Sequence, residues 1–385
     1  MIGLVGGATV ELGDPSGRTS ERTKMDDQVR TSNEDRISKQ MEKIFTNGIA
    51  YAKSKGFTNF GNLIMTNNAI WWKDMTLLSF MTTIGRHLRV SQMMAKESVK
   101  LRLESENGIG YNEFTYQALQ AYDFYHLHAT YSCNVQFGGN DQWGNITAGI
   151  DLTSRLQFAN KKPQTSTFGI TAPLLTTPSG EKFGKSAGNA VWLDPELTSP
   201  FELYQYFVRL PDDQIGNYLR AFTLLTLPEI SSIVDQHALN PEKRIGQHAL
   251  AKEVTDLVHG LGAGDRSQRA TALLFAKPDR NDNDKKNWQF SAAEIINAFQ
   301  NDQHLKFLPS DQVLGQSVVS VLRAVANFPS NKSAMNRINA GGIYVGKDLD
   351  RLTDPRALVE PELLIDDKVL LLRVGKADLH VVALE

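Results

Sequence analysis

The chain has 385 residues, of which 41% are hydrophobic and 22% charged, as in a globular protein of two or three domains. Its 41 basic and 43 acidic residues give a net charge of −2, so there is no overall basic field for nucleic acid, although a local patch would suffice. The single cysteine, Cys133, excludes an internal disulfide framework and fits a reducing compartment. No apolar run approaches the roughly 20 residues that span a bilayer.

The pattern of the first 210 residues predicts an α/β domain. Apolar runs at 2–5 and 133–137 each end at a pair of glycines, Gly6-Gly7 and Gly138-Gly139. A strand followed by a glycine-rich turn is how a parallel sheet presents a ligand site at its carboxyl edge. We therefore expect the functional groups to follow these two turns.

Beyond residue 210 the pattern changes twice. Apolar residues recur close to a 3.6-residue period over 245–258, and Gly260 is placed to end that helix. A smaller unit follows from 312, with an expected helix at 318–327 and expected strands at 343–345 and 369–374. These changes predict a helical domain at 211–311 and a small α+β domain at 312–385.

The first candidate site is the turn at 13–17, close to the first strand. Asp14 would hold a negative charge there, and a carboxylate suits a cationic group such as an α-ammonium. The alternative is an exposed turn, because Asp-Pro-Ser-Gly forms turns without any ligand.

The second candidate is an expected helix at 112–126, with Asn112 as its cap and Glu113 in its first turn. Tyr116, Gln120 and Asp123 have the spacing i, i+4, i+7 and therefore project from one face. Beside aromatic residues, such a face can line a polar pocket. The alternative is a solvated helix face, for which this spacing is also common.

Two further candidates are rich in glycine. In 138–145, Asp141 follows a glycine turn and could take ribose hydroxyls, although a structural turn is the alternative. In 182–186, Lys182 and Lys185 on a glycine-rich loop could stabilise a polyphosphate, unless this is a plain basic loop. The loop is not a Walker A motif, because Gly-x-x-x-x-Gly-Lys-Ser is absent.

Taken together and in this order, the segments 6–22, 113–124, 138–147 and 182–186 resemble the tyrosyl-tRNA synthetases, a class I aminoacyl-tRNA synthetase family. The resemblance covers nearly the whole chain, and the segments 185–193 and 201–213 are most similar to the mitochondrial branch. It implies a Rossmann-like catalytic domain at 1–210, an α-helical anticodon-recognition domain at 211–311 and a small ribosomal-protein-like RNA-binding domain at 312–385.

The resemblance also implies the roles of single residues. Asp123 would accept the phenol hydroxyl of tyrosine, and Asp14, Tyr116 and Gln120 would bind the α-ammonium. Asn68 and Gln136 would position the substrate, and Gln142 would contact the tyrosyl carboxylate or the adenylate. Gly138, Gly139 and Asp141 would bind ATP, and the loop with Lys182, Lys185 and Ser186 would grip the pyrophosphate. A site that binds a hydroxyl rejects the analogue lacking it by about 10⁴–10⁵-fold, the tyrosyl enzymes themselves being the known case.

The implied activity is a tyrosine–tRNA ligase that uses ATP with Mg²⁺, has no tightly bound cofactor and no protein metal site, and acts on tRNA-Tyr. A homodimer without membrane attachment is implied, in the mitochondrial matrix or, alternatively, in a bacterial-type cytoplasm. The family places a His-x-Gly-His segment before the first glycine pair, and nothing precedes Met1 here, so we expect a truncated chain with impaired activation. The rival hypothesis is a non-catalytic RNA-binding protein of the group I intron splicing type. The nine basic and nine acidic residues of 312–385 argue against it.

Overall fold

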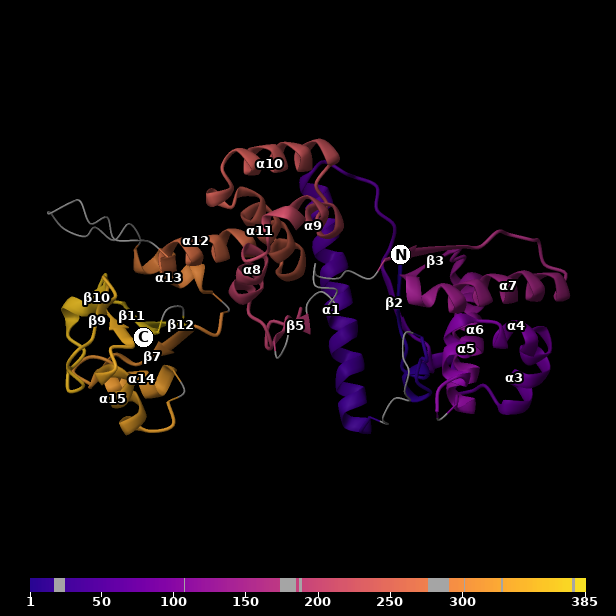
Figure 1. The fold of residues 1–385 in the computed structure, drawn as a ribbon, viewed down its shortest axis with the longest axis horizontal. Coiled ribbons are helices and arrows are strands. Elements are labelled where there is room, and N and C mark those ends of the chain that lie inside the picture. The colour runs from indigo at the N-terminus through magenta and orange to yellow at the C-terminus, as the bar shows by residue number, and fades with distance from the viewer. Residues whose placement is uncertain are drawn as a thin grey trace. The chain divides into compact units, whose positions relative to one another are not determined.

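The computed structural model describes residues 1–16, 25–106, 108–173, 185–186, 189–275, 291–300, 302–326, 328–375 and 378–385. It divides into two compact units (Figure 1): residues 1–45 with 59–190, and residues 46–58 with 191–385. Within the described ranges, no helix is long and apolar enough to cross a membrane.

The first unit contains parallel strands, as the sequence predicts. Strand β1 (Ile2–Val5) pairs with β2 (Ile64–Asn67), and β3 (Val135–Gly139) pairs with β4 (Phe168–Ala172). In each pair the carboxyl ends coincide, with Val5 opposite Asn67 and Gly139 opposite Ala172. Residues that follow paired strands therefore emerge at one edge.

The helices of the first unit follow and flank these strands. They are α1 (Asp27–Ser54), whose last part belongs to the second unit, α2 (Ala69–Trp72), α3 (Leu77–Thr83), α4 (Val90–Met94), α5 (Glu97–Leu103), α6 (Tyr111–Tyr131) and α7 (Trp143–Ala159). Helices α6 and α7 lie side by side (Figure 1) and share a buried apolar core formed by Ile84, Ala121, Leu152 and Leu156. Two short strands of this unit, β5 (Lys185–Ser186) and β6 (Asn189–Ala190), form an antiparallel pair.

Helix α6 begins at Tyr111, one residue before the predicted start, so the prediction of Asn112 as its cap is wrong. Gly110 is the N-cap, and its N–H donates to Glu113 Oε2 over 3.4 Å. The side chain of Asn112 donates from Nδ2 to Leu12 O at 2.8 Å. The side chain of Asn112 therefore binds a residue that is distant in the sequence, whereas the local pattern predicts that it caps the helix.

The helices of the second unit are α8 (Pro200–Val208), α9 (Ile215–Phe222), α10 (Leu227–Leu239), α11 (Ile245–His259), α12 (Ala263–Phe275), α13 (Ala292–Ala298), α14 (Val318–Val325) and α15 (Asn331–Asn339). Helix α11 ends as predicted, because Gly260 follows it with a φ of 103°, a conformation that favours glycine.

The second unit also contains a mixed sheet with the order β7-β12-β11-β8-β9, and β10 pairs with β11. Its strands are β7 (Leu305–Leu308), β8 (Ile343–Val345), β9 (Asp350–Arg351), β10 (Leu364–Ile365), β11 (Val369–Val374) and β12 (Asp378–Leu384). The predicted strands at 343–345 and 369–374 are confirmed, and α14 lies within the predicted helix at 318–327.

Strand β11 is buried on both faces, which explains its unbroken apolar sequence. Val369 and Leu371 pack in one core with residues of α8, α12 and α13, whereas Leu370 and Leu372 pack in another with residues of α14 and α15. Two elements cross the predicted domain boundaries. Strand β7 lies before residue 311 but belongs to the sheet, and α8 lies before residue 211 but packs with α12 and α13. The predicted division into a helical domain and a small RNA-binding domain therefore remains a proposal.

Candidate active site

Asp123 lies on α6 and has 2% of its surface exposed, which makes it more enclosed than Asp14 and Asp141, the other predicted acidic site residues. Its Oδ1 accepts hydrogen bonds from Trp71 Nε1 at 2.8 Å and from Trp72 Nε1 at 2.7 Å. Its Oδ2 accepts one from Asn68 Nδ2 at 3.0 Å. The carboxylate is thus held by three neutral donors from one short segment, in which Asn68 is the N-cap of α2 and the two tryptophans end that helix.

Two opposing influences act on the charge of this carboxylate. Burial raises the pKa of Asp123 above its ordinary value, and the hydrogen bonds from Asn68, Trp71 and Trp72 act in the opposite direction. All three partners are donors, so they bind the ionised form, which only accepts hydrogen bonds. The geometry therefore provides a buried acceptor for a polar hydrogen.

Asn68 follows β2 and connects three parts of the first unit. Its Oδ1 accepts the backbone N–H of Ala8 at 2.8 Å, and its Nδ2 donates to Thr9 Oγ1 as well as to Asp123. Its side chain is fully buried. The end of β1, the end of β2 and helix α6 are therefore fixed around one amide, which agrees with the predicted positioning role without testing it.

Asp14 and Gln142 lie far apart in the sequence and meet in the structure. Gln142 Nε2 donates to Asp14 Oδ2 at 2.8 Å, and Asp14 Oδ1 accepts the backbone N–H of Ser16 at 2.9 Å. The buried Asn145 donates to Ser16 Oγ at 3.4 Å and to Gln142 Oε1 at 3.3 Å. The turn after β1 and the turn after β3 therefore belong to a single polar site.

The glycine pair at the end of β3 allows this close approach. A Cβ on Gly138 would lie 3.1 Å from both Gln142 Cβ and Ile146 Cδ1. A Cβ on Gly139 would lie 2.5 Å from Oδ1 of Asp141, whose exposed side chain can move aside. A side chain at position 138 would therefore crowd the start of α7, and glycine leaves this space free.

The other predicted tyrosine contacts are partly exposed. Helix α6 is continuous, so Tyr116 and Gln120 project from the same side as Asp123. Gln136 on β3 is half-buried, and its Oε1 is inaccessible to solvent and has no hydrogen-bond partner among the described residues. An unpaired buried acceptor is costly unless another donor reaches it.

The predicted pyrophosphate loop is only partly covered by the structure. Lys182 lies outside the described residues. Lys185 and Ser186 form β5, which pairs with β6, and only their backbone is described.

Several residues that build the site were given no role from the sequence, although Ser16 and Asn145 lie within the candidate segments 13–17 and 138–145. They are Thr9, Ser16, Trp71, Trp72 and Asn145. The adjacent tryptophans, separated by two residues from an Asn-Asn pair, were a usable signal, because a buried carboxylate needs donors and an indole N–H only donates.

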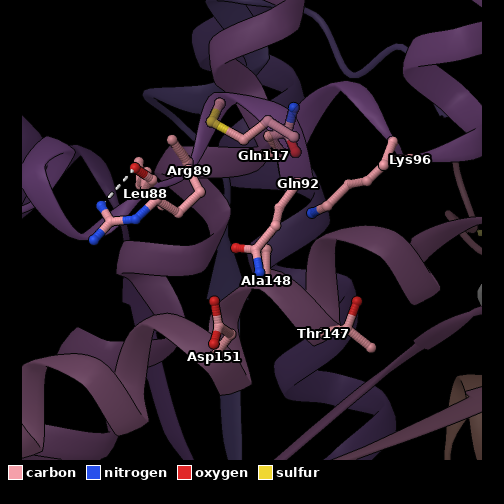
Figure 2. A pocket seen from close by; sticks show the side chains of 11 residues that line it. Leu88, Arg89, Gln92, Lys96, Gln117, Thr147, Ala148 and Asp151 are labelled. Carbon is pink, nitrogen blue, oxygen red and sulfur yellow. Dashed lines mark hydrogen bonds between the residues drawn. The ribbon is translucent and has the colours of Figure 1, made fainter.

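A pocket of about 320 Å³ lies apart from these residues, where α4, α6 and α7 meet. Figure 2 shows the polar part of its lining, including Gln92, Lys96, Thr147 and Asp151. Lys96 Nζ donates to Gly144 O in the first turn of α7 at 2.5 Å, and burial lowers the pKa of Lys96 to about 8. None of the predicted site residues lines this pocket.

The family model for class I tRNA synthetases (W and Y) matches residues 1–276. The mitochondrial tyrosine–tRNA ligase of Saccharomyces cerevisiae is 40% identical over 98% of this chain and 74% of its own length. The human mitochondrial enzyme is 37% identical over 99% of this chain and 76% of its own. A crystal structure of a C-terminally truncated mitochondrial tyrosyl-tRNA synthetase from Aspergillus nidulans superposes with a TM-score of 0.63 at 36% identity, covering 71% of this chain and 76% of that one.

The chain belongs to the class I tRNA synthetases for tryptophan and tyrosine. Within this class, the relatives named above place it on the tyrosine side, with the tyrosine–tRNA ligases of mitochondria. The predicted family and α/β fold class are thereby confirmed, and so is the prediction of an aminoacyl-tRNA ligase.

Proposed function

We propose that this chain activates L-tyrosine with ATP and transfers the tyrosyl group to tRNA-Tyr in mitochondrial translation. The observation that carries the proposal is the hydrogen bond between Gln142 Nε2 and Asp14 Oδ2 at 2.8 Å. It brings the carboxylate proposed for the α-ammonium beside the glycine turn proposed for the adenosine. The names of the similar proteins support the same reading and favour it over a non-catalytic RNA-binding role.

The proposed chemistry has two steps. A carboxylate oxygen of tyrosine attacks the α-phosphorus of ATP, forming the P–O bond of the adenylate while the bond to the leaving pyrophosphate breaks. A ribose hydroxyl at the end of the tRNA then attacks the tyrosyl carbonyl carbon, and AMP leaves. Neither step needs a covalent enzyme intermediate, so positioning and charge stabilisation by the protein suffice.

The proposed roles divide by the part of the substrate that they contact. Asp123 accepts the phenol hydroxyl; Asp14, Tyr116 and Gln120 bind the α-ammonium; Asn68 and Gln136 hold these groups in place. Gln142 contacts the carboxylate or the adenylate, and Gly138, Gly139 and Asp141 contact the nucleotide. Lys182, Lys185 and Ser186 bind the pyrophosphate.

Mg²⁺ enters, in this proposal, as part of the ATP substrate, since a divalent cation normally accompanies its phosphates. The described residues contain no group of three or more His, Cys, Asp or Glu side chains that could hold a metal ion. We further propose the mitochondrial matrix as the location, in line with the mitochondrial relatives. A homodimer is proposed as the assembly. Sedimentation of the purified chain would test the dimer.

Tyrosine-dependent exchange of pyrophosphate into ATP tests the activation step. We expect exchange with L-tyrosine, at the reduced rate expected from the sequence, and none with L-phenylalanine or L-tryptophan, followed by charging of tRNA-Tyr. Asp14→Asn should weaken the binding of tyrosine and leave ATP binding nearly unchanged. Absence of exchange with tyrosine, or equal exchange with phenylalanine, would contradict the proposal. Tighter binding of a group I intron RNA than of tRNA-Tyr, at one stated salt concentration, would favour the RNA-binding alternative.

A further inference from the structure

The carboxylate of Asp123 has almost all of its acceptor positions filled. An ionised carboxylate offers about four lone-pair positions, two on each oxygen. Both positions on Oδ1 are taken, by the indole N–H groups of Trp71 and Trp72, and one position on Oδ2 is taken by Asn68. The remaining position is therefore on Oδ2.

The indole of Trp72 is fixed by its own neighbours. Its ring lies edge-on to Tyr122, with the ring centres 5.2 Å apart, and tilted against Phe80 at 5.8 Å. Trp71 is held separately, stacked on His126 at 4.2 Å with 21° between the ring planes. Because each indole packs against different rings, neither needs the other to keep its direction.

We infer that Trp72 is a specificity-determining positioning residue. Together with Trp71 it occupies both acceptor positions of Asp123 Oδ1, so that Oδ2 is left as the acceptor of the tyrosine phenol hydroxyl. The inference rests on the proposed function. A phenylalanine side chain would leave this last position empty and buried, which a polar site tolerates poorly. Trp72 does not touch the substrate in this arrangement, because it acts through Asp123.

The same free position on Oδ2 would take a proton, so protonation of Asp123 and binding of the phenol exclude each other. The titratable groups around it are His126 behind Trp71 and Tyr122 against Trp72, with Tyr125 next to Tyr122. Burial raises the pKa of Asp123, and the donated hydrogen bond from Trp72 is one of three that oppose this rise. Loss of that donor should therefore move the acid limit of tyrosine binding to higher pH.

The test is calorimetric titration of the full chain with L-tyrosine and L-phenylalanine between pH 5 and 8. In Trp72→Phe, which keeps a ring against Phe80 and Tyr122, we expect tyrosine affinity at pH 7 to fall by about tenfold and phenylalanine affinity to stay unchanged. The acid limit of tyrosine binding should also move to higher pH. Trp192→Phe is the matched control, because Trp192 is exposed and lies in the other unit.

If Trp72→Phe and the unmodified chain bind tyrosine with equal affinity and equal pH dependence, the inference about Trp72 is overturned and the proposed function stands. Failure of the unmodified chain to bind tyrosine would overturn the proposed function as well. If Trp72→Phe does not fold, the indole N–H resonances of the unmodified chain provide a second measurement. Both indoles should stay hydrogen-bonded when tyrosine is added, and the release of either one would show that the phenol takes Oδ1 instead.

Discussion

The ion pair between Arg102 on α5 and Glu113 in the first turn of α6 is almost completely buried. Arg102 Nη2 lies 2.5 Å from Glu113 Oε2, and the two side chains are 3% and 1% exposed. Removing one partner leaves the other charge buried without compensation, which costs about 3–5 kcal/mol. We therefore expect Arg102→Met, which keeps the apolar stem, to lower the free energy of unfolding by that amount.

A second substitution separates the uncompensated charge from the loss of packing. In the double variant Arg102→Met with Glu113→Gln the buried charge is gone, and the introduced side-chain amide would still offer an oxygen to the N–H of Gly110. We expect the double variant to recover most of the loss, because replacing both charges of a buried pair is often close to neutral. With the single variant Glu113→Gln as the fourth corner of the cycle, the departure from additivity measures the coupling between the two side chains.

Urea unfolding followed by tryptophan fluorescence and by circular dichroism measures these free energies, provided that both probes and the slopes agree between variants. A loss below about 1 kcal/mol in Arg102→Met would be within the range of an ordinary surface substitution. That result, or a double variant less stable than the single one, would refute the reasoning.

Three further outcomes are expected in the same unfolding assay. Gly169→Ala places a methyl group 2.4 Å from Ile146 Cγ2 and should lower the free energy of unfolding by about 1–3 kcal/mol. Its control is Gly61→Ala, which should be neutral because no atom lies within 4 Å of the added methyl group. Equal effects of the two substitutions would contradict this. Burial lowers the pKa of Lys96 from 10.5 to about 8, so the unfolded state binds more protons in this range and stability rises with pH there. Between pH 7.5 and pH 10.5 the free energy of unfolding of the unmodified chain should gain about 3 kcal/mol relative to that of Lys96→Met. Parallel stability profiles of the two chains over this range would contradict this. Asn68→Ala removes a buried amide with three hydrogen bonds and should cost about 2–4 kcal/mol; a loss below about 1 kcal/mol would be inconsistent with that.

Much of the local structure could be predicted from the sequence, because periodicity and glycine placement act over a few residues. The run at 2–5 forms β1, Gly260 ends α11, and the apolar run at 369–374 forms β11. Helix α1, with 28 residues, was not predicted, and none of its side chains is buried. Apolar residues do recur at helical spacing in its second half, at Ile37, Met41, Ile44 and Ile49, so a periodic signal was present in the sequence and was missed.

The candidate site shows the limit of local sequence patterns. The spacing of Tyr116, Gln120 and Asp123 predicted a common helix face, and the continuous helix α6 provides it. The donors that fill the acceptor positions of Asp123 come from a segment more distant in the chain, and no local pattern pairs Trp72 with that carboxylate. The functional roles of all these residues remain proposals, since they depend on substrates as well as on the fold.

The order of strands in the second unit has a consequence for how the sheet assembles. Strand β11 pairs with β12 across a short connection, with Val374 opposite Asp378, whereas β7 pairs in parallel with β12 over a long stretch of chain, with Leu305 opposite Val381. Closing a long loop costs more entropy than closing a short hairpin. The β11–β12 hairpin is therefore expected to fold early and to serve as the template on which β7 docks late, which makes the amides of β7 the first of the three strands to exchange with solvent during partial opening.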